Sequence, residues 1–255
     1  MPLHRTLLVA AMALPALAVA APLELPFRLE DGVPVIQARI DGREARLLID
    51  SGGAAALALR PDWAQPDAAA SAAASQDAQG QARLNRGLAV RQLELAGQPI
   101  GEPPPAQTWA KARRPAGVDG YLGWGWLRQR RWIIDYAAAR LLLPAPEDAW
   151  PANCGDKPQR FEMLGSLPFV RLRAGDGSML ALGLDTGASR NVIQPAREPA
   201  TAGPLAWENQ ALGAGGFAAV ALQVPVLDGF LGQDFFKRYR VCVDPAGQRL
   251  WVQPL

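Results

Sequence analysis

The sequence predicts a mostly β protein built from two related halves, and three observations support this. Short stretches alternate apolar and polar residues, as half-buried strands do, and turn sequences such as Asp-Gly join them. One apolar strand runs into Asp50-Ser51-Gly52, and a second runs into Asp185-Thr186-Gly187. A further block repeats at a constant spacing later in each half. Such an internal repeat indicates that one folding unit was duplicated.

The first 20 residues have the pattern of a cleavable export signal. A short polar start precedes an apolar run from Leu7 to Leu17, and Ala18-Val19-Ala20 is a small-residue cleavage sequence. The alternative is a core helix at the N-terminus, but a core helix needs neither a polar start nor a small-residue cleavage sequence. Because the run is too short for a permanent span, we expect no stable membrane anchor. Cleavage after Ala20 would give a periplasmic or secreted protein.

Composition removes several classes of chemistry from the expected mature chain. The single histidine, His4, lies in the signal segment, so histidine-dependent triads and histidine zinc sites are not expected. Cys154 and Cys242 are the only cysteines, and an oxidising compartment favours a disulfide between them. The net charge of +2 gives no strong field for nucleic acid. Carboxylates are therefore the expected catalytic groups, with no cofactor and no metal.

The first half begins with a predicted hairpin. Residues 34–40 alternate as a half-buried strand, Asp41-Gly42 is a two-residue turn, and residues 43–49 return to Asp50. Residues 88–95 alternate again, with one slip, and are predicted to form another strand.

Three stretches have the composition of surface connections. Residues 67–82 consist mainly of Ala, Ser, Gln and Asp, which predicts a loop or hairpin tip. Pro99–Pro105 is too rich in proline to join a sheet. Residues 144–158 form a predicted linker. The expected organisation is a signal segment over 1–20, a first lobe over 21–143 and a second lobe over 159–255.

The second half repeats this order. A Gly175-Asp176-Gly177 turn separates two predicted strands that lead to Asp185. The block from Asp228 to Gly232 matches the block from Asp119 to Gly123. The same spacing relates later pairs: Arg131 and Arg240, Asp135 and Asp244, Arg140 and Arg249. The interval from Asp50 to Gly123 is longer than the interval from Asp185 to Gly232, so the first half must carry a longer loop.

These motifs resemble the aspartic protease superfamily, and more closely its small retropepsin-like bacterial members than the large pepsins. The resemblance rests on the strand hairpin, the Asp-Ser/Thr-Gly triplet and the later apolar-apolar-Gly of each half, and it covers most of the mature chain. It implies a bilobal pepsin/retropepsin-like double-ψ barrel fold with a pseudo-twofold axis. It also implies an aspartic endopeptidase that binds an extended peptide and needs only a monomer.

The resemblance assigns roles to residues of both triplets. Asp50 and Asp185 would form the catalytic dyad. Each triplet hydroxyl would bond to the opposite loop and each glycine would permit a tight turn, which involves Ser51, Thr186, Gly52 and Gly187. Two carboxylates at close range hold a single proton between them. One can then accept a proton from water while the other protonates an amide carbonyl.

Other positions would frame the cleft. Tyr121-Leu122 and Phe230-Leu231 are expected to pack beneath the two catalytic loops. Residues 67–87 are a candidate for the flap that covers substrate, with Gly80 near its tip, although they contain no tyrosine. Ser189 is a further candidate for substrate contact.

The sequence also departs from the family pattern. Gly53 replaces the usual alanine, position 54 lacks a hydroxyl, and Gly213–Gly216 is interpreted as a vestigial flap counterpart. Two alternatives therefore stay open. A non-catalytic binding or scaffold protein would keep the fold, and a glycosidase would hold its two carboxyls at about 5–5.5 or 6.5–9.5 Å with room for a sugar.

The two repeated blocks, Asp119–Gly123 and Asp228–Gly232, are called the closing blocks of the two halves. Carboxylates and aromatic residues in or near them are explained more simply by structural roles than by catalysis or substrate binding. Four repeated aspartates precede glycines or turns and are expected to be structural: Asp119, Asp135, Asp228 and Asp244. Trp124 and Trp126 lie beside a predicted buried strand and are expected in the core.

Overall fold

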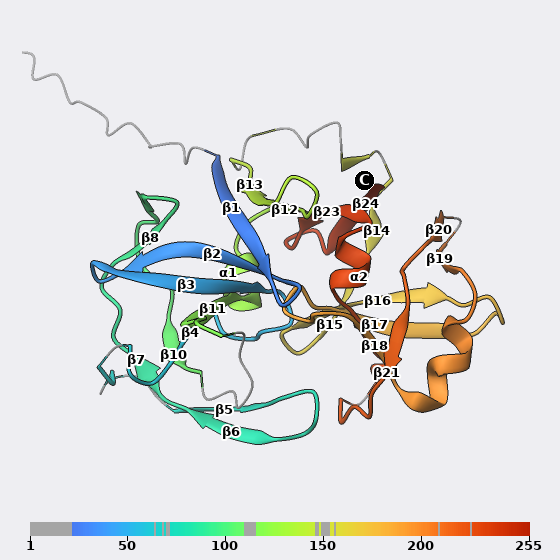
Figure 1. The fold of residues 1–255 in the computed structure, drawn as a ribbon, viewed down its shortest axis with the longest axis horizontal. Helices are drawn as coiled ribbons and strands as arrows, with labels where there is room; N and C mark the ends of the chain where they lie inside the picture. Colours follow the sequence, from blue (N-terminus) through green and yellow to red (C-terminus); the bar gives the residue numbers. More distant parts are fainter. Residues whose placement is uncertain are drawn as a thin grey trace, which may run out of the picture.

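A computed structural model describes residues 22–255 except 64, 68, 70, 71, 110–115, 146, 147, 149–153, 156, 209 and 225. The expected export signal lies outside the described residues, as do parts of the expected linker and of the flap region. The described chain folds into two mostly β lobes (Figure 1). Within it, no helix has the length and apolar composition of a membrane span.

The first half contains these elements in order: β1 (Leu23–Glu30), β2 (Val33–Ile40), β3 (Arg43–Asp50), β4 (Leu57–Leu59), β5 (Ala73–Gln76), β6 (Ala82–Asn85), β7 (Gly87–Leu88), β8 (Leu93–Leu95), β9 (Gln98–Pro99), β10 (Ala106–Thr108), β11 (Gly120–Gly123), α1 (Trp124–Leu127), β12 (Trp132–Asp135) and β13 (Arg140–Leu143). The expected turn at Asp41-Gly42 joins β2 to β3, and both of its residues have positive φ. The predicted strand over 88–95 is wrong as a single element. It is divided between β7 and β8, which pair with different strands.

The second half contains β14 (Gln159–Arg160), β15 (Glu162–Leu164), β16 (Leu167–Arg173), β17 (Met179–Leu184), β18 (Asn191–Ile193), η2 (Pro195–Thr201), β19 (Leu205–Trp207), β20 (Gln210–Leu212), β21 (Phe217–Ala219), β22 (Gly229–Leu231), α2 (Gln233–Phe236), β23 (Tyr239–Asp244) and β24 (Arg249–Pro254). The predicted turn over 175–177 joins β16 to β17.

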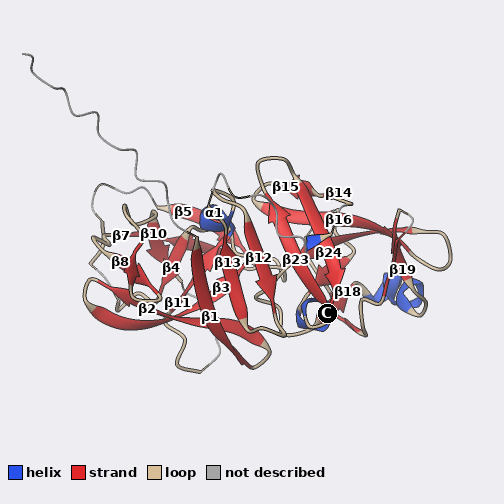
Figure 2. Cartoon of the chain, turned by 90° about the horizontal axis from the view of Figure 1, so that it is seen from above, coloured by secondary structure: helices blue, strands red, loops and turns tan. Residues whose placement is uncertain are grey.

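The two halves meet in one antiparallel sheet with the order β14-β24-β23-β12-β13-β1 (Figure 2). At its centre Ile133 pairs with Cys242, and these two residues are equivalent in the repeat, because the spacing between them is the one that relates Asp119 to Asp228. Trp132 pairs with Val243 and Ile134 with Val241, so the register is symmetric about this point. A pseudo-twofold axis therefore passes between Ile133 and Cys242.

In each lobe, the repeated closing block (Asp119–Gly123 or Asp228–Gly232) lies beside the strand that leads to the Asp-Ser/Thr-Gly triplet. In the first lobe β11 runs parallel to β3, which sets Gly123 next to Asp50. In the second lobe β22 runs parallel to β17, which sets Leu231 next to Leu184. The apolar residues of both closing blocks are buried, as are Trp124 and Trp126, so these tryptophans are core residues as expected.

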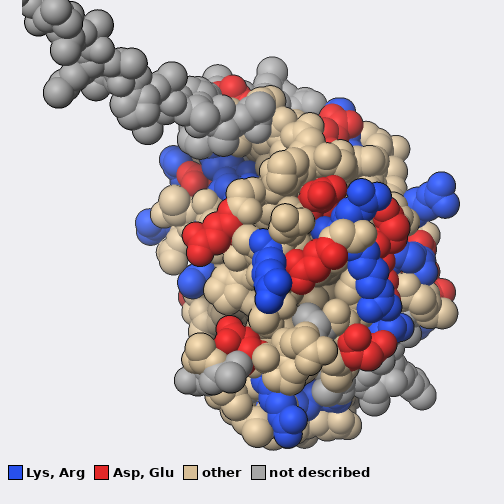
Figure 3. Space-filling view, turned by 90° about the vertical axis from the view of Figure 1, so that its left-hand side faces the viewer, with Lys and Arg blue, Asp and Glu red and all other residues tan. Residues whose placement is uncertain are grey.

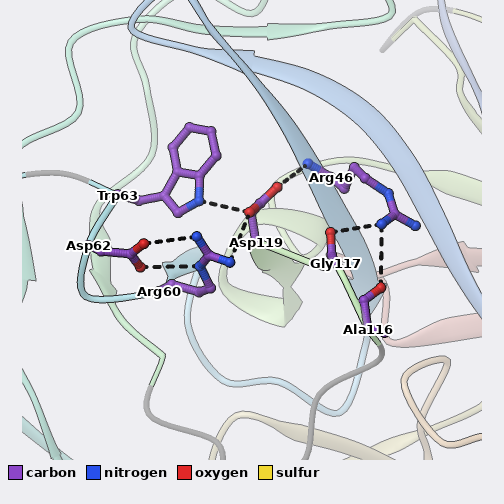
Figure 4. A network of polar contacts seen from close by, with 7 residues as sticks. All are labelled: Arg46, Arg60, Asp62, Trp63, Ala116, Gly117 and Asp119. Atoms are coloured by element: carbon purple, nitrogen blue, oxygen red, sulfur yellow. Dashed lines mark hydrogen bonds and ion pairs between the residues drawn. The ribbon is translucent and has the colours of Figure 1, made fainter.

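The aspartates that begin the closing blocks hold the hairpin strands. Asp119 accepts hydrogen bonds from the backbone N–H of Arg46 at 3.0 Å and from the indole of Trp63 at 2.9 Å (Figure 4). Asp228 accepts the equivalent backbone bond from Ala181 at 2.8 Å and pairs with Arg197. The structural roles expected for these two carboxylates are confirmed.

Cys154 and Cys242 form the expected disulfide, with Cα atoms 5.9 Å apart and a sequence separation of 88. It ties the end of the expected linker to the central strand β23. In the chain-entropy model, closing a loop of this length contributes on the order of 4 kcal/mol.

Asp135 and Arg240 form an ion pair across the central sheet at 2.6 Å, and the Asp135 side chain is only 4% exposed. Burial opposes ionisation of Asp135, but the Ala138 N–H and the Arg240 guanidinium outweigh it and lower its pKa from the usual 3.8. Because the folded pKa is lowered, this stabilisation is present above the unfolded pKa and is lost as pH falls through the folded value.

Arg240→Met is therefore expected to lower the free energy of unfolding at neutral pH by about 3 kcal/mol, because it leaves a buried carboxylate without its cation. Denaturant unfolding should show that the difference from wild type shrinks as pH falls below the usual pKa of an aspartate. A difference that stays constant from neutral to strongly acidic pH would contradict this assignment.

Candidate active site

The two triplets form loops of the same shape at the ends of β3 and β17. The backbone N–H of Gly53 donates to the Asp50 carbonyl, and the N–H of Ala188 donates to the Asp185 carbonyl, each at 3.1 Å. The carboxylates accept equivalent local bonds: Gly52 N–H to Asp50 Oδ1 at 3.1 Å and Gly187 N–H to Asp185 Oδ1 at 2.9 Å. These bonds fix the direction of each aspartate side chain.

Reciprocal hydrogen bonds join the loops to each other. The Ser51 hydroxyl donates to the Leu184 carbonyl at 2.8 Å and accepts from the Thr186 N–H at 3.0 Å. The Thr186 hydroxyl donates to the Ile49 carbonyl at 2.8 Å and accepts from the Ser51 N–H at 3.0 Å. Ser51 and Thr186 are fully buried, so little water competes for these bonds. The arrangement matches the cross-bonding that the resemblance implies.

Each carboxylate lies against the glycine of the opposite triplet. A β-carbon built on Gly187 would lie 2.6 Å from Asp50 Oδ1, and one built on Gly52 would lie 2.6 Å from Asp185 Cγ. Any side chain at either glycine would collide with the carboxylate from the other lobe. The structure thus brings Asp50 and Asp185 together, and glycine is required at both positions because of this close approach.

Sequence reasoning missed Tyr136, which lies beneath both loops. Its hydroxyl donates to the Thr186 carbonyl at 3.5 Å, and its ring stacks on Phe236. Burial and the charges of Asp185 and Asp50 raise the pKa of Tyr136, so the phenol stays neutral. The repeat gives no signal for this residue, because the equivalent position is Pro245.

A cleft of about 610 Å³ opens above the loops. Both aspartates line it, as does Ser189, whereas Gly80 is not among its lining residues. Its second-lobe side is largely apolar and includes Leu167, Leu222 and Phe230. A cleft of this volume with a partly apolar wall can hold a segment of a peptide chain.

Strands β5 and β6 form an antiparallel hairpin beside the cleft, with its turn at 77–81, as expected for the flap. The Ala78 carbonyl at the tip accepts a hydrogen bond from the Gln223 N–H of the second lobe at 2.8 Å. Gly80 faces the same residue: a β-carbon there would lie 2.9 Å from Gln223 Cβ. The flap tip therefore bridges the two lobes.

The flap explains the longer loop of the first half. β8 pairs with β2 and β9 pairs with β8, and in the same way β19 pairs with β16 and β20 pairs with β19. The described second half has no hairpin equivalent to β5-β6. The interpretation of Gly213–Gly216 as a vestigial flap is wrong. This segment joins β20 to β21, and the carbonyls of Ala214 and Gly216 accept bonds from the buried Asn191 side chain.

Charged side chains of both signs lie on the face of the molecule that Figure 3 presents. Figure 3 shows Lys and Arg interspersed with Asp and Glu on the face that it presents. This mixture of signs fits the small net charge of the chain.

No family model and no curated protein matches the sequence. Among solved structures, the chain is similar to the crystal structure of aspartic proteinase from Irpex lacteus. The TM-score is 0.63 at 13% identity, over 92% of this chain and 97% of that chain. The chain has the aspartic proteinase fold. Basic 7S globulin from soybean is also similar, with a TM-score of 0.61 at 12% identity over 91% of this chain and 95% of that one. The narrower likeness to retropepsin-like bacterial proteins stays a prediction.

Proposed function

We propose that this protein is an exported aspartic endopeptidase that hydrolyses peptide bonds with a water activated by Asp50 and Asp185. The observation that carries the proposal is the mutual placement of the two carboxylates, each set against the glycine of the opposite triplet. The buried bonds of Ser51 and Thr186 support it, because they hold both loops in a fixed relation.

The proposed reaction needs only the dyad, the water and the substrate. Two neighbouring carboxyls carry one proton. The ionised one accepts a proton from water as the water oxygen bonds to the amide carbon, and the protonated one donates to the carbonyl oxygen. A tetrahedral diol forms. As the diol collapses and the C–N bond breaks, the carboxyl that took its proton from water donates that proton to the departing nitrogen. The other carboxylate accepts a proton from one diol hydroxyl, so the products are a carboxylic acid and an amine and the dyad again holds one proton.

The cleft favours a peptide in an extended conformation. Such a chain can pair its backbone with strand edges and place side chains into pockets on either side. The flap hairpin lies beside this path, and its tip contact with Gln223 must open or shift for a long substrate to enter. Because one chain carries both aspartates, a monomer is sufficient. The disulfide supports an oxidising, extracytoplasmic location.

The second candidate is a non-catalytic binding or scaffold protein. The bridged flap favours it, because a closed tip restricts entry to the cleft. A similar structure reported above is named a globulin, and a shared fold does not by itself imply hydrolysis. The glycosidase alternative gains no support from the comparisons, because the fold is that of an aspartic proteinase.

Digestion of an unstructured peptide library by the wild-type chain tests the proposal. We expect internal peptide cleavage between acidic and neutral pH, detected by mass spectrometry of the products. Binding of library peptides without new termini at any pH would overturn the proposal in favour of the binding protein. The Asp50→Asn/Asp185→Asn double variant is the control for contaminating proteases, and it should release no products.

A further inference from the structure

The two halves seat an aromatic ring in different places. In the parallel ladders beside the triplets, Tyr121 pairs with Leu48 in the first half, and Phe230 pairs with Gly183 in the second. The two aromatic residues are equivalent in the repeat, but their strand partners differ in size. This difference decides where each ring can lie.

In the second half the ring covers its own strand partner. A β-carbon on Gly183 would lie 2.6 Å from Phe230 Cδ1 and 2.7 Å from Cε1, so the ring lies over the glycine. The loop after Asp185 keeps an alanine, Ala188, as its fourth residue. In the second half, therefore, the glycine that contacts the aromatic ring is Gly183, which lies in strand β17 and not in the catalytic loop.

In the first half Leu48 is buried and packs in one apolar cluster with Tyr121, so the Leu48 side chain occupies the place that the Phe230 ring takes over Gly183. The Tyr121 ring lies over the catalytic loop instead. A β-carbon on Gly53 would lie 2.5 Å from Tyr121 Cε2 and 3.0 Å from Asp50 Oδ2. The unusual glycine at position 53 thus makes room for the ring.

This ring also borders the cleft. Tyr121 is 8% exposed, lines the cleft and meets Trp109 edge to face with ring centroids 5.4 Å apart. Burial and the charge of Asp50 raise the pKa of Tyr121, which keeps its hydroxyl protonated. The first-lobe wall next to Asp50 is therefore a packed, neutral aromatic pair.

We propose that Tyr121, seated on Gly53, determines specificity on the first-lobe side of the cleft and positions the loop that carries Asp50. The inference rests on the proposed peptidase function. The ring narrows the space beside Asp50, so the substrate residue bound there has a small side chain. Shortening Tyr121 enlarges this subsite, and any side chain added at position 53 displaces either the ring or the loop.

Four proteins test the inference with the peptide library: wild type, Tyr121→Leu, Gly53→Ala and the double variant. Tyr121→Leu should shift preference at one substrate position from small to aromatic side chains. Gly53→Ala should lower kcat/KM by about 100-fold, the cost of a misplacement of about 1 Å at a catalytic group. Most of this loss should disappear in the double variant, because the methyl then occupies the space that the ring leaves.

Tyr121→Phe is the matched control, because it keeps the ring and should keep the wild-type preference. A purely structural role would lower the unfolding temperature of Tyr121→Leu without changing which peptides are cut, and that result overturns the inference. Equal losses from Gly53→Ala with and without Tyr121 also overturn it. Absence of cleavage by wild type is a different outcome: it overturns the proposed peptidase function, and the inference with it.

Discussion

Asp185→Asn is expected to reduce peptide cleavage by about 10²–10⁴-fold while leaving the unfolding temperature unchanged. Asparagine has the shape of aspartate and keeps an oxygen for the 2.9 Å bond from the Gly187 N–H. It cannot share a proton with Asp50, so neither water activation nor protonation of the carbonyl oxygen proceeds by the proposed route. The same result is expected for Asp50→Asn. The measurement is kcat/KM on one library peptide beside thermal unfolding.

Asp228→Asn is the matched control, because it changes another repeated aspartate that has structural contacts. It weakens the bond from Ala181 and the ion pair with Arg197, so the free energy of unfolding should fall by about 1–3 kcal/mol. Cleavage per folded molecule should be retained. Wild-type rates in both Asp185→Asn and Asp50→Asn would remove the dyad from the mechanism.

Thr186→Val is expected to destabilise the protein by several kcal/mol and to reduce cleavage as well. Valine has nearly the same volume but no hydroxyl. The Ser51 N–H and the Ile49 carbonyl both lose their bonds to Thr186 in a fully buried site, and each such loss costs about 1–3 kcal/mol. Activity should fall because the two aspartate loops are no longer held in register. Denaturant unfolding and kcat/KM measure the two effects.

Thr186→Ser distinguishes the contribution of the hydroxyl from that of the methyl group, because serine keeps only the hydroxyl. The first triplet already uses serine at the equivalent position, where the Ser51 hydroxyl makes both cross-bonds. The serine variant should therefore keep most of the stability and activity that valine loses. If valine and serine variants were equally stable, the cross-bonds would not be what holds the two loops together.

Much of the fold could be predicted because the repeat encodes it. The constant spacing of the repeat predicts equivalent strands, and in the structure this same spacing relates Ile133 to Cys242 at the centre of the shared sheet. Turn chemistry located the hairpin at Asp41-Gly42, because Asp-Gly suits two residues with positive φ. The disulfide followed from having only two cysteines in a chain with an export pattern.

Three features of the structure have no local sequence pattern that predicts them. Tyr136 has no counterpart in the repeat, and its place beneath both loops comes from the way β12 crosses the centre of the molecule. The alternation over 88–95 looked continuous, but two different neighbours divide it. Gly213–Gly216 resembled a flap tip in composition, whereas the packing of Asn191 decides its conformation.

The sequence by itself determined that two copies of one β unit each carry an acid, a hydroxyl residue and a glycine after an apolar strand. Alternation, turn residues and repeat spacing are properties of neighbouring positions, so they can be read along the chain. Only the tertiary structure decided that Asp50 faces Gly187, that Asp185 faces Gly52 and that Tyr121 requires Gly53. These contacts join residues distant in sequence, and their close approach depends on side-chain volume in three dimensions.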